Sequence, residues 1–216
     1  MKHISPNLVA ADIPARAPTR RALAKQQTRL KVLAAARRLF SEEGYEGATI
    51  RDIAAAAGMS TGAVFANFSD KSDLFREIMT ADLGELLEQM RETAAKGRGV
   101  EDVLVRVFMA GYGYYKQRLP LARAGFSVWW DREGGPTLRG LGPVLAIQEI
   151  FTEQLAAAVE RGELSQETEV KLRGQMLFEI YLANFQYAIF EGWSLDALQV
   201  RARDQVRILL AGARRG

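Results

Sequence analysis

Residues 50–68 read IRDIAAAAGMSTGAVFANF and place a glycine between two short apolar runs. In the first run Ile50, Ile53 and Ala57 recur at three- and four-residue intervals, the period of one face of a helix. Gly58 follows directly and can take the left-handed backbone that ends a helix. The stretch therefore predicts two short helices joined by a sharp turn.

The residues around this turn suit two helices that cross steeply. Thr49 and Ser60 are good N-cap residues for the first and second helix. Ala54 is small enough for a close crossing, and Met59 and Val64 join Ile53 in a small core. This arrangement predicts a helix-turn-helix unit, whose second helix enters the DNA major groove.

Helical periodicity continues on both sides of this unit, and no alternating strand pattern or sequence repeat interrupts it. We predict an all-α fold of about nine helices, with residues 131–143 as a loop. The helices are expected at about 28–43, 50–57, 60–68, 70–96, 100–117, 120–130, 144–161, 167–191 and 195–213.

Composition limits the chemistry that the chain can perform. It has no cysteine, and its single histidine is His3, so thiolate chemistry and His-based catalytic or metal sites are not expected. It also lacks a nucleophile elbow, a phosphate loop and metal-ligand spacing. The apolar run 176–190 is interrupted by polar residues, and no signal-peptide pattern is present. We expect a cytoplasmic protein with no membrane span, no cofactor, no metal and no enzymatic activity.

Charge is distributed unevenly along the chain. Residues 1–71 carry a net charge of +5 and the remainder −2, out of +3 in total. A basic N-terminal part indicates a polyanionic partner, although a solubilising basic tail gives the same pattern. Residues 1–27 combine prolines with scattered arginines and are predicted to be a disordered basic arm.

Residues 28–75, TRLKVLAAARRLFSEEGYEGATIRDIAAAAGMSTGAVFANFSDKSDLF, resemble the DNA-binding domain of the TetR family of bacterial regulators. The agreement lies in the spaced pattern AA..LF...GY...T.RDIA..AG.S.G..F.NF..K..LF. The resemblance implies a homodimer that represses genes and leaves its operator when a small molecule enters a C-terminal pocket. Accordingly, residues 28–75 are expected to bind DNA, and residues 76–216 to bind the ligand and dimerise.

Matching positions in the family pattern identify candidate DNA contacts. Phe65 stands where tyrosine is more usual, and Thr61 where lysine or arginine is frequent, so we expect weaker non-specific binding from this helix. Basic residues of the arm offset this loss if the arm contacts DNA, namely Arg16, Arg20, Arg21, Lys25 and Arg29. The candidate contacts are Thr49, Arg51, Ser60, Thr61, Gly62, Ala63, Phe65, Asn67 and Lys71.

The segment 176–190 is apolar nearly all the way round and must be covered on several faces. With residues 195–213 it can form a four-helix bundle across a two-fold axis, although the centre of a monomeric bundle gives the same pattern. Paired half-sites about 34 Å apart require two recognition helices, which favours the dimer.

Aromatic residues of the C-terminal part predict a small-molecule pocket, and Gly111 and Gly113 indicate room beside them. The same spacing also suits an ordinary core. The candidate pocket residues are Tyr112, Tyr115, Phe126, Trp129, Trp130, Phe151, Tyr181, Asn184 and Phe185.

The sequence thus predicts a repressor that binds a palindromic double-stranded operator as a homodimer and is released by a small hydrophobic or aromatic effector. One alternative keeps the DNA-binding domain but gives the C-terminal domain a protein partner, as in a nucleoid-associated or cell-division regulator. An enzyme with a helix-turn-helix appendage is a second alternative.

Overall fold

The computed structural model describes residues 19–130 and 144–213, and for residues 127–130 only the backbone is described. These residues contain nine helices and no β-strand, which confirms the all-α prediction. The helices are α1 (Arg20–Gly47), α2 (Ile50–Ala56), α3 (Thr61–Phe65), α4 (Lys71–Ala94), α5 (Val100–Lys116), α6 (Leu119–Trp130), α7 (Leu145–Glu160), α8 (Val170–Ile189) and α9 (Leu195–Leu210).

Helix α1 begins earlier than the sequence analysis predicted. It starts at Arg20, with Thr19 as the N-cap, and its regular backbone is interrupted at Gly44 as expected. The prediction of a disordered arm is therefore wrong for residues 20–27, while residues 1–18 lie outside the described ranges. The physical reason is that residues 20–27 are leucine, alanine, arginine, lysine and glutamine, which are good helix formers. The predicted loop 131–143 also lies outside the described ranges.

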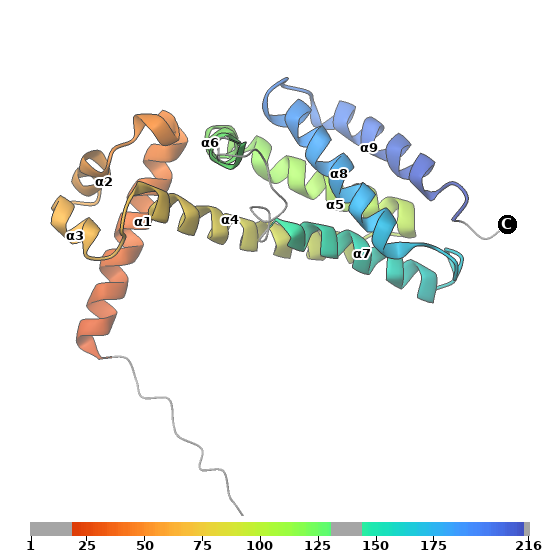
Figure 1. Cartoon of the computed structure of the whole chain (residues 1–216), viewed down its shortest axis with the longest axis horizontal. Helices are drawn as coiled ribbons and strands as arrows, with labels where there is room; N and C mark the ends of the chain where they lie inside the picture. Colours follow the sequence, from red (N-terminus) through yellow and green to blue (C-terminus); the bar gives the residue numbers. More distant parts are fainter. Residues whose placement is uncertain (1–18, 131–143, 214–216) are drawn as a thin grey trace, which may run out of the picture.

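Two hydrophobic clusters organise the molecule, and α4 runs from one to the other (Figure 1). The smaller cluster joins α1, α2, α3 and the start of α4, and it also takes Leu121 and Ala124 from α6. The larger cluster joins the rest of α4 to α5, α7, α8 and α9. The predicted domain boundary at residues 75 and 76 falls inside the continuous helix α4. Because α4 contributes residues to both clusters, a tilt of α4 moves side chains in both.

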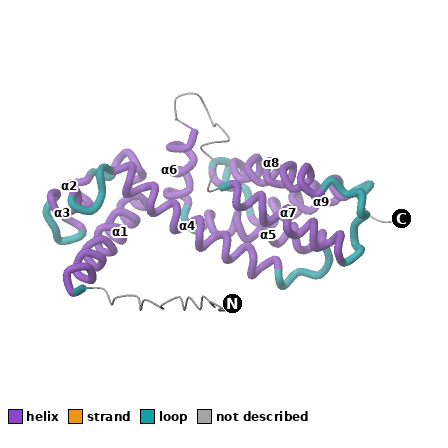
Figure 2. Tube along the Cα trace, turned by 60° about the horizontal axis from the view of Figure 1, so that its bottom comes forward, coloured by secondary structure: helices purple, strands orange, loops and turns teal. Residues whose placement is uncertain are grey.

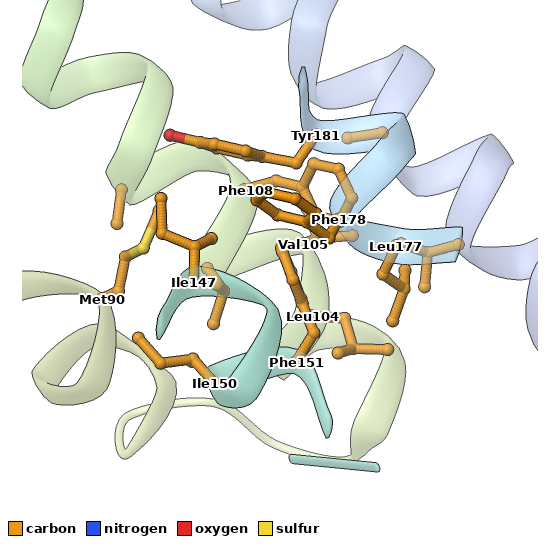
Figure 3. Close-up of a cluster of buried hydrophobic side chains, with 14 of the residues drawn as sticks. Met90, Leu104, Val105, Phe108, Ile147, Ile150, Phe151, Leu177, Phe178 and Tyr181 are labelled. Carbon is orange, nitrogen blue, oxygen red and sulfur yellow. The ribbon is translucent and has the colours of Figure 1, made fainter. Parts of the chain in front are cut away.

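The centre of the larger cluster is aromatic and tightly packed. The rings of Tyr112 and Tyr181 stack with centroids 5.2 Å apart. Tyr181 projects from α8 over Phe108 (Figure 3). A Cβ added at Gly111 would lie 2.4 Å from the Tyr181 hydroxyl oxygen, so this glycine is needed for ring packing. The prediction that Gly111 leaves empty space for a ligand is therefore wrong.

Alanine substitutions at the two glycines of α5 test this packing. Gly111→Ala is expected to cost about 1–3 kcal/mol of unfolding free energy, because the buried ring of Tyr181 must shift. Gly113→Ala is the matched control, since its added Cβ meets no atom within 4 Å and helix propensity favours alanine by about 1 kcal/mol. Urea unfolding followed by circular dichroism measures both changes, and equal effects at the two positions would contradict this packing.

Candidate nucleic-acid interface

The turn between α2 and α3 closes with two backbone hydrogen bonds. Gly58 has a φ of 68°, in the left-handed region. Its N–H donates to the Ala55 carbonyl at 3.0 Å, and the Met59 N–H donates to the Ala54 carbonyl at 2.9 Å. This is the Schellman arrangement, which satisfies the last carbonyls of α2 and turns the chain sharply into α3.

Helix α3 has one buried face and one open face. Val64 is fully buried in the smaller cluster, and Phe68, just beyond α3, is 2% exposed. Thr61, Gly62 and Phe65 of the same helix are exposed to solvent, Phe65 by 55%. A short helix that is anchored by one side and presents small side chains on the other can be inserted into a groove.

Two predicted contact residues use their hydroxyls to cap helices. Thr49 accepts a hydrogen bond from the Asp52 N–H at 3.2 Å and starts α2. Ser60 accepts one from the Ala63 N–H at 3.3 Å and starts α3. Arg51, in the first turn of α2, is exposed, so it lies free to reach a ligand on the surface. The caps predicted for both helices are confirmed.

Two other predicted contacts, Asn67 and Lys71, are held by the protein itself. The Asn67 side-chain amide donates to the Ala63 carbonyl at 3.0 Å and closes the end of α3. The Lys71 ammonium donates to the Tyr45 carbonyl at 2.9 Å and lies 4.3 Å from the centre of the Tyr45 ring. Neither group projects freely from the open face of α3.

Arg29, which the sequence assigns to the basic arm, holds α1 against the end of α3. Its guanidinium donates to the Asn67 carbonyl at 2.7 Å and lies 4.3 Å from the centre of the Phe68 ring. It also forms an ion pair with Glu77 of α4. The pattern gave no signal for this role, because a basic residue at this position suits an exposed arm equally well.

A buried carboxylate lies where α1 meets α4. Asp82 is fully buried, and its Oδ1 lies 2.5 Å from Nη1 of Arg37 on α1. Its Oδ2 has no hydrogen-bond partner. Burial raises the pKa of Asp82 above its ordinary value of 3.8, and Arg37 only partly offsets this effect. The pair therefore connects α1 of the helix-turn-helix end to α4.

A small cavity lies beside this junction, between α4, α5, α6, α7 and α8. Its volume is about 110 Å³, and no charged side chain lines it. Burial raises the pKa of the Tyr115 hydroxyl well above its ordinary value, so this group is a neutral phenol at physiological pH. The lining residues are Met79, Leu83, Tyr115, Ala122, Gly125, Phe126, Val144, Ile147, Tyr181, Leu182 and Phe185.

Four predicted pocket residues line this cavity, namely Tyr115, Phe126, Tyr181 and Phe185. The residues that the sequence analysis missed are aliphatic, such as Met79 and Leu83 of α4. Their spacing marked them as core, and only the assembled fold shows that they border a space. The side chains of Trp129 and Trp130 lie outside the described residues.

Three predicted pocket residues lie elsewhere in the C-terminal helices. Tyr112 and Phe151 are fully buried in the larger cluster and do not line the cavity. Asn184 faces α9, where its Oδ1 accepts from Arg201 Nε at 2.8 Å and its Nδ2 donates to Gln205 Oε1 at 2.7 Å. Tyr112 of α5 and Phe151 of α7 are enclosed in the larger cluster, and Asn184 of α8 is turned toward α9, so none of the three lines this cavity.

The described ranges 19–130 and 144–213 offer neither a metal site nor a membrane span. No group of three or more His, Cys, Asp or Glu residues there is placed to hold a metal ion. None of the helices in those ranges is long and apolar enough to cross a membrane.

Part of the chain matches a known family of proteins. Residues 32–78 match the family model described as bacterial regulatory proteins, tetR family. The chain is 43% identical to the HTH-type transcriptional repressor AcnR of Corynebacterium glutamicum over 65 residues, which cover 30% of this chain and 35% of AcnR. It is 35% identical to the HTH-type transcriptional regulator AcrR of Shigella flexneri over 99 residues, 44% of this chain and 46% of AcrR.

Structural similarity extends over most of the chain. The fatty acid degradation regulator FadR from Bacillus halodurans matches with a TM-score of 0.68 at 20% identity, covering 83% of this chain and 94% of FadR. By contrast, the sequence match spans about a third of the length of AcnR. Residues 32–78 therefore match the N-terminal domain of the tetR family, and the chain has the fold of TetR-family transcriptional regulators.

Proposed function

We propose that this protein is a transcriptional repressor that places α3 in the major groove of double-stranded DNA. The observation that carries the proposal is the division of α3 into a buried anchor at Val64 and an open face at Thr61, Gly62 and Phe65. Small side chains let the helix approach the base edges closely, and sequence is read through thymine methyl contacts and DNA shape. Arg51 and Lys71 bind phosphates on either side, Lys71 after exchanging its contact with Tyr45.

We further propose that the protein binds its operator as a homodimer through α8 and α9. Helix α8 and its C-cap residue expose Leu172, Met176 and Phe190, and the last two lie four and eighteen residues after the first, which places all three on one stripe. Helix α9 exposes Val200 and Ile208, the latter by 74%. The two helices lie on the same side of the C-terminal part (Figure 1). Two copies of this apolar face would bury each other in a four-helix bundle.

Charge placed on this face is expected to separate the subunits. Ile208→Glu raises the dimer dissociation constant by at least about tenfold, because a carboxylate loses water when the apolar faces meet. Sedimentation velocity over a range of protein concentrations measures the change. Gln166→Glu, at an exposed position outside α8 and α9, is the control. Unchanged association of the Ile208 variant would contradict this choice of interface.

The cavity is proposed to receive a small neutral effector. Its uncharged walls exclude stable binding of an ionised group within it. Met79 lines the cavity and also packs against the smaller cluster, so an occupant displaces a side chain that supports the DNA-binding end. By linkage, an effector that lowers DNA affinity must bind the DNA-free protein more tightly by the same factor.

Filling the cavity is expected to abolish binding of an apolar probe. Benzene, a neutral ring small enough for a space of about 110 Å³, binds the wild-type protein, and Ala122→Phe lowers its affinity by at least about tenfold, because an added ring occupies the space. Ala81→Phe on the exposed side of α4 is the matched control. Isothermal titration calorimetry measures both variants, and equal benzene affinity in the wild type and the Ala122 variant would place the ligand elsewhere.

Selection of duplexes from a random-sequence pool tests the proposed function as a whole. The expected product is a palindrome whose half-sites are about one helical turn apart, bound by two copies of the chain. Recovery of duplexes without a common sequence would favour a nucleoid-associated role. Failure to retain any duplex at 50 mM salt would overturn the proposal.

A further inference from the structure

The first two turns of α1 project beyond the rest of the molecule. Residues 20–27 are all exposed, and the first residue of α1 that is buried is Val32. Two views of the fold place the start of α1 at the same end of the molecule as α3 (Figures 1 and 2). The helix therefore extends well past the elements that support it.

The overhanging part of α1 turns a basic face in the direction of α3. Lys25 lies seven residues before Val32, and Arg21 lies eighteen residues before Leu39, spacings that return to the same side of a helix. Val32 and Leu39 are buried in the smaller cluster. One continuous face is therefore apolar where α1 packs on the body and cationic where α1 runs past it.

Arg29 locates this face relative to α3. It lies four residues after Lys25, and its guanidinium contacts the Asn67 carbonyl and the Phe68 ring at the end of α3. At 1.5 Å per residue, Lys25 lies about 6 Å and Arg21 about 12 Å beyond that contact along the helix axis. The major groove is about 12 Å wide, so a strand of the duplex runs about 6 Å from a helix centred in it.

The charges on this face are not balanced by the described protein. Residues 19–41 contain no aspartate or glutamate. Arg29, Arg37 and Arg38 each pair with a carboxylate from a later residue, whereas within residues 19–130 and 144–213 no carboxylate pairs with Arg21 or Lys25. Cations near a helix N-terminus also oppose the helix dipole. A polyanion bound against this face would relieve both the repulsion between the unpaired cations and their unfavourable interaction with the helix dipole.

We infer that Arg21 and Lys25 bind backbone phosphates of the duplex beside the groove that α3 enters. This inference rests on the proposed function and extends the DNA contact beyond the helix-turn-helix unit. The contacts are electrostatic and carry no sequence information, but they set the position of α1 on the duplex. Leu23 and Leu30 lie on the opposite side of α1 and take no part.

Two double variants on the same helix test the inference. Arg21→Gln with Lys25→Gln removes the proposed contacts, and Arg20→Gln with Lys31→Gln removes the same charge from the other side of α1. Glutamine has a helix propensity close to that of lysine and arginine, and circular dichroism checks that α1 is kept. The probe is a 40-base-pair duplex selected by the wild-type protein from a random pool, titrated from 50 to 300 mM KCl.

The slope of log affinity against log salt is the deciding quantity. Each phosphate contact contributes about 0.9 to the magnitude of this negative slope. Arg21 and Lys25 of both subunits make four contacts in a dimer, so their loss reduces the magnitude by about 3.6. The control variant is expected to change the slope by less than about 1. Trimming the flanking base pairs should weaken the wild type and leave the Arg21/Lys25 variant unaffected.

Three outcomes would overturn the inference. Equal slope changes in both variants would show a general effect of charge. An unchanged slope in the Arg21/Lys25 variant would show that these residues do not contact phosphates, while leaving the proposed function intact. Loss of binding to phosphatidylglycerol vesicles with an unchanged DNA slope would assign the face to a membrane. Absence of any wild-type binding to the pool would overturn the proposed function and this inference together.

Discussion

Replacement of Thr61 by glutamate is expected to weaken binding to the selected duplex by about 100-fold. Thr61 is the first residue of α3 and is exposed, so a carboxylate there would face the phosphates of the groove. Juxtaposed like charges cost several kcal/mol at an interface, and about 2.8 kcal/mol corresponds to 100-fold. Fluorescence anisotropy at fixed salt measures the change.

The same substitution should stabilise the folded protein slightly. A carboxylate in the first turn of a helix interacts favourably with the helix dipole, by about 0.3–1 kcal/mol. Thr61→Lys is the matched opposite: it should bind DNA more tightly and fold slightly less stably. If both variants bind DNA like the wild type, α3 does not face the duplex. The same conclusion holds if the more stable variant also binds DNA more tightly.

Arg37→Met is expected to destabilise the protein by about 2 kcal/mol. Removal of one partner of a fully buried ion pair costs about 3–5 kcal/mol. The cost expected here is smaller than that range because Arg37 is 36% exposed and solvent screens the pair. The loss leaves the fully buried carboxylate of Asp82 without a cation. Urea unfolding measures the change, with Arg38→Met as the control, since Arg38 and its partner Glu42 are both exposed.

Asp82→Asn should have the opposite effect at neutral pH, where it is expected to be neutral or stabilising. Because the pKa of Asp82 is raised on folding, the native state binds more protons than the unfolded chain. Its contribution to stability is therefore greatest below pH 3.8 and falls as pH rises toward the folded pKa. Glu85 strengthens this shift, and Arg37 and Arg118 oppose it.

Comparison of wild-type and Asp82→Asn unfolding between pH 3.5 and pH 7 isolates the effect. The difference in unfolding free energy should grow in favour of the variant as pH rises. A constant difference would show that the carboxylate titrates normally. In DNA binding, both Arg37→Met and Asp82→Asn should weaken the complex, because the pair fixes α1 against α4.

The local pattern around Gly58 determined most of what could be predicted. Short-range rules set the turn, both caps and the spacing of Ile53 and Val64, and each of these lies within a few residues of its partner. The same reasoning placed the later helices close to their observed positions, since each has its own apolar period and break. The all-α fold followed from these elements together.

Contacts between distant residues were the part that sequence could not give. Arg29, Arg37 and Lys71 are isolated basic residues in the sequence, and such residues are equally common at solvent-exposed and DNA-contacting positions. Their partners in the fold lie 48, 45 and 26 residues away in the chain. The cavity likewise depends on how five helices meet. Asn184 and Phe151 carry the same aromatic or polar character as pocket residues, but helix rotation places them in other contacts.

Directed DNA cleavage from α3 tests the central claim most directly. The chain has no cysteine, so Phe65→Cys introduces a single thiol at an exposed site that can carry an iron–EDTA cleavage reagent. Glu149→Cys, exposed on α7, carries the same reagent as the control. The account predicts two clusters of strand cleavage one helical turn apart from the Phe65 site and none from the Glu149 site. Absence of cleavage from the Phe65 site, or the same weak pattern from both sites, would contradict it.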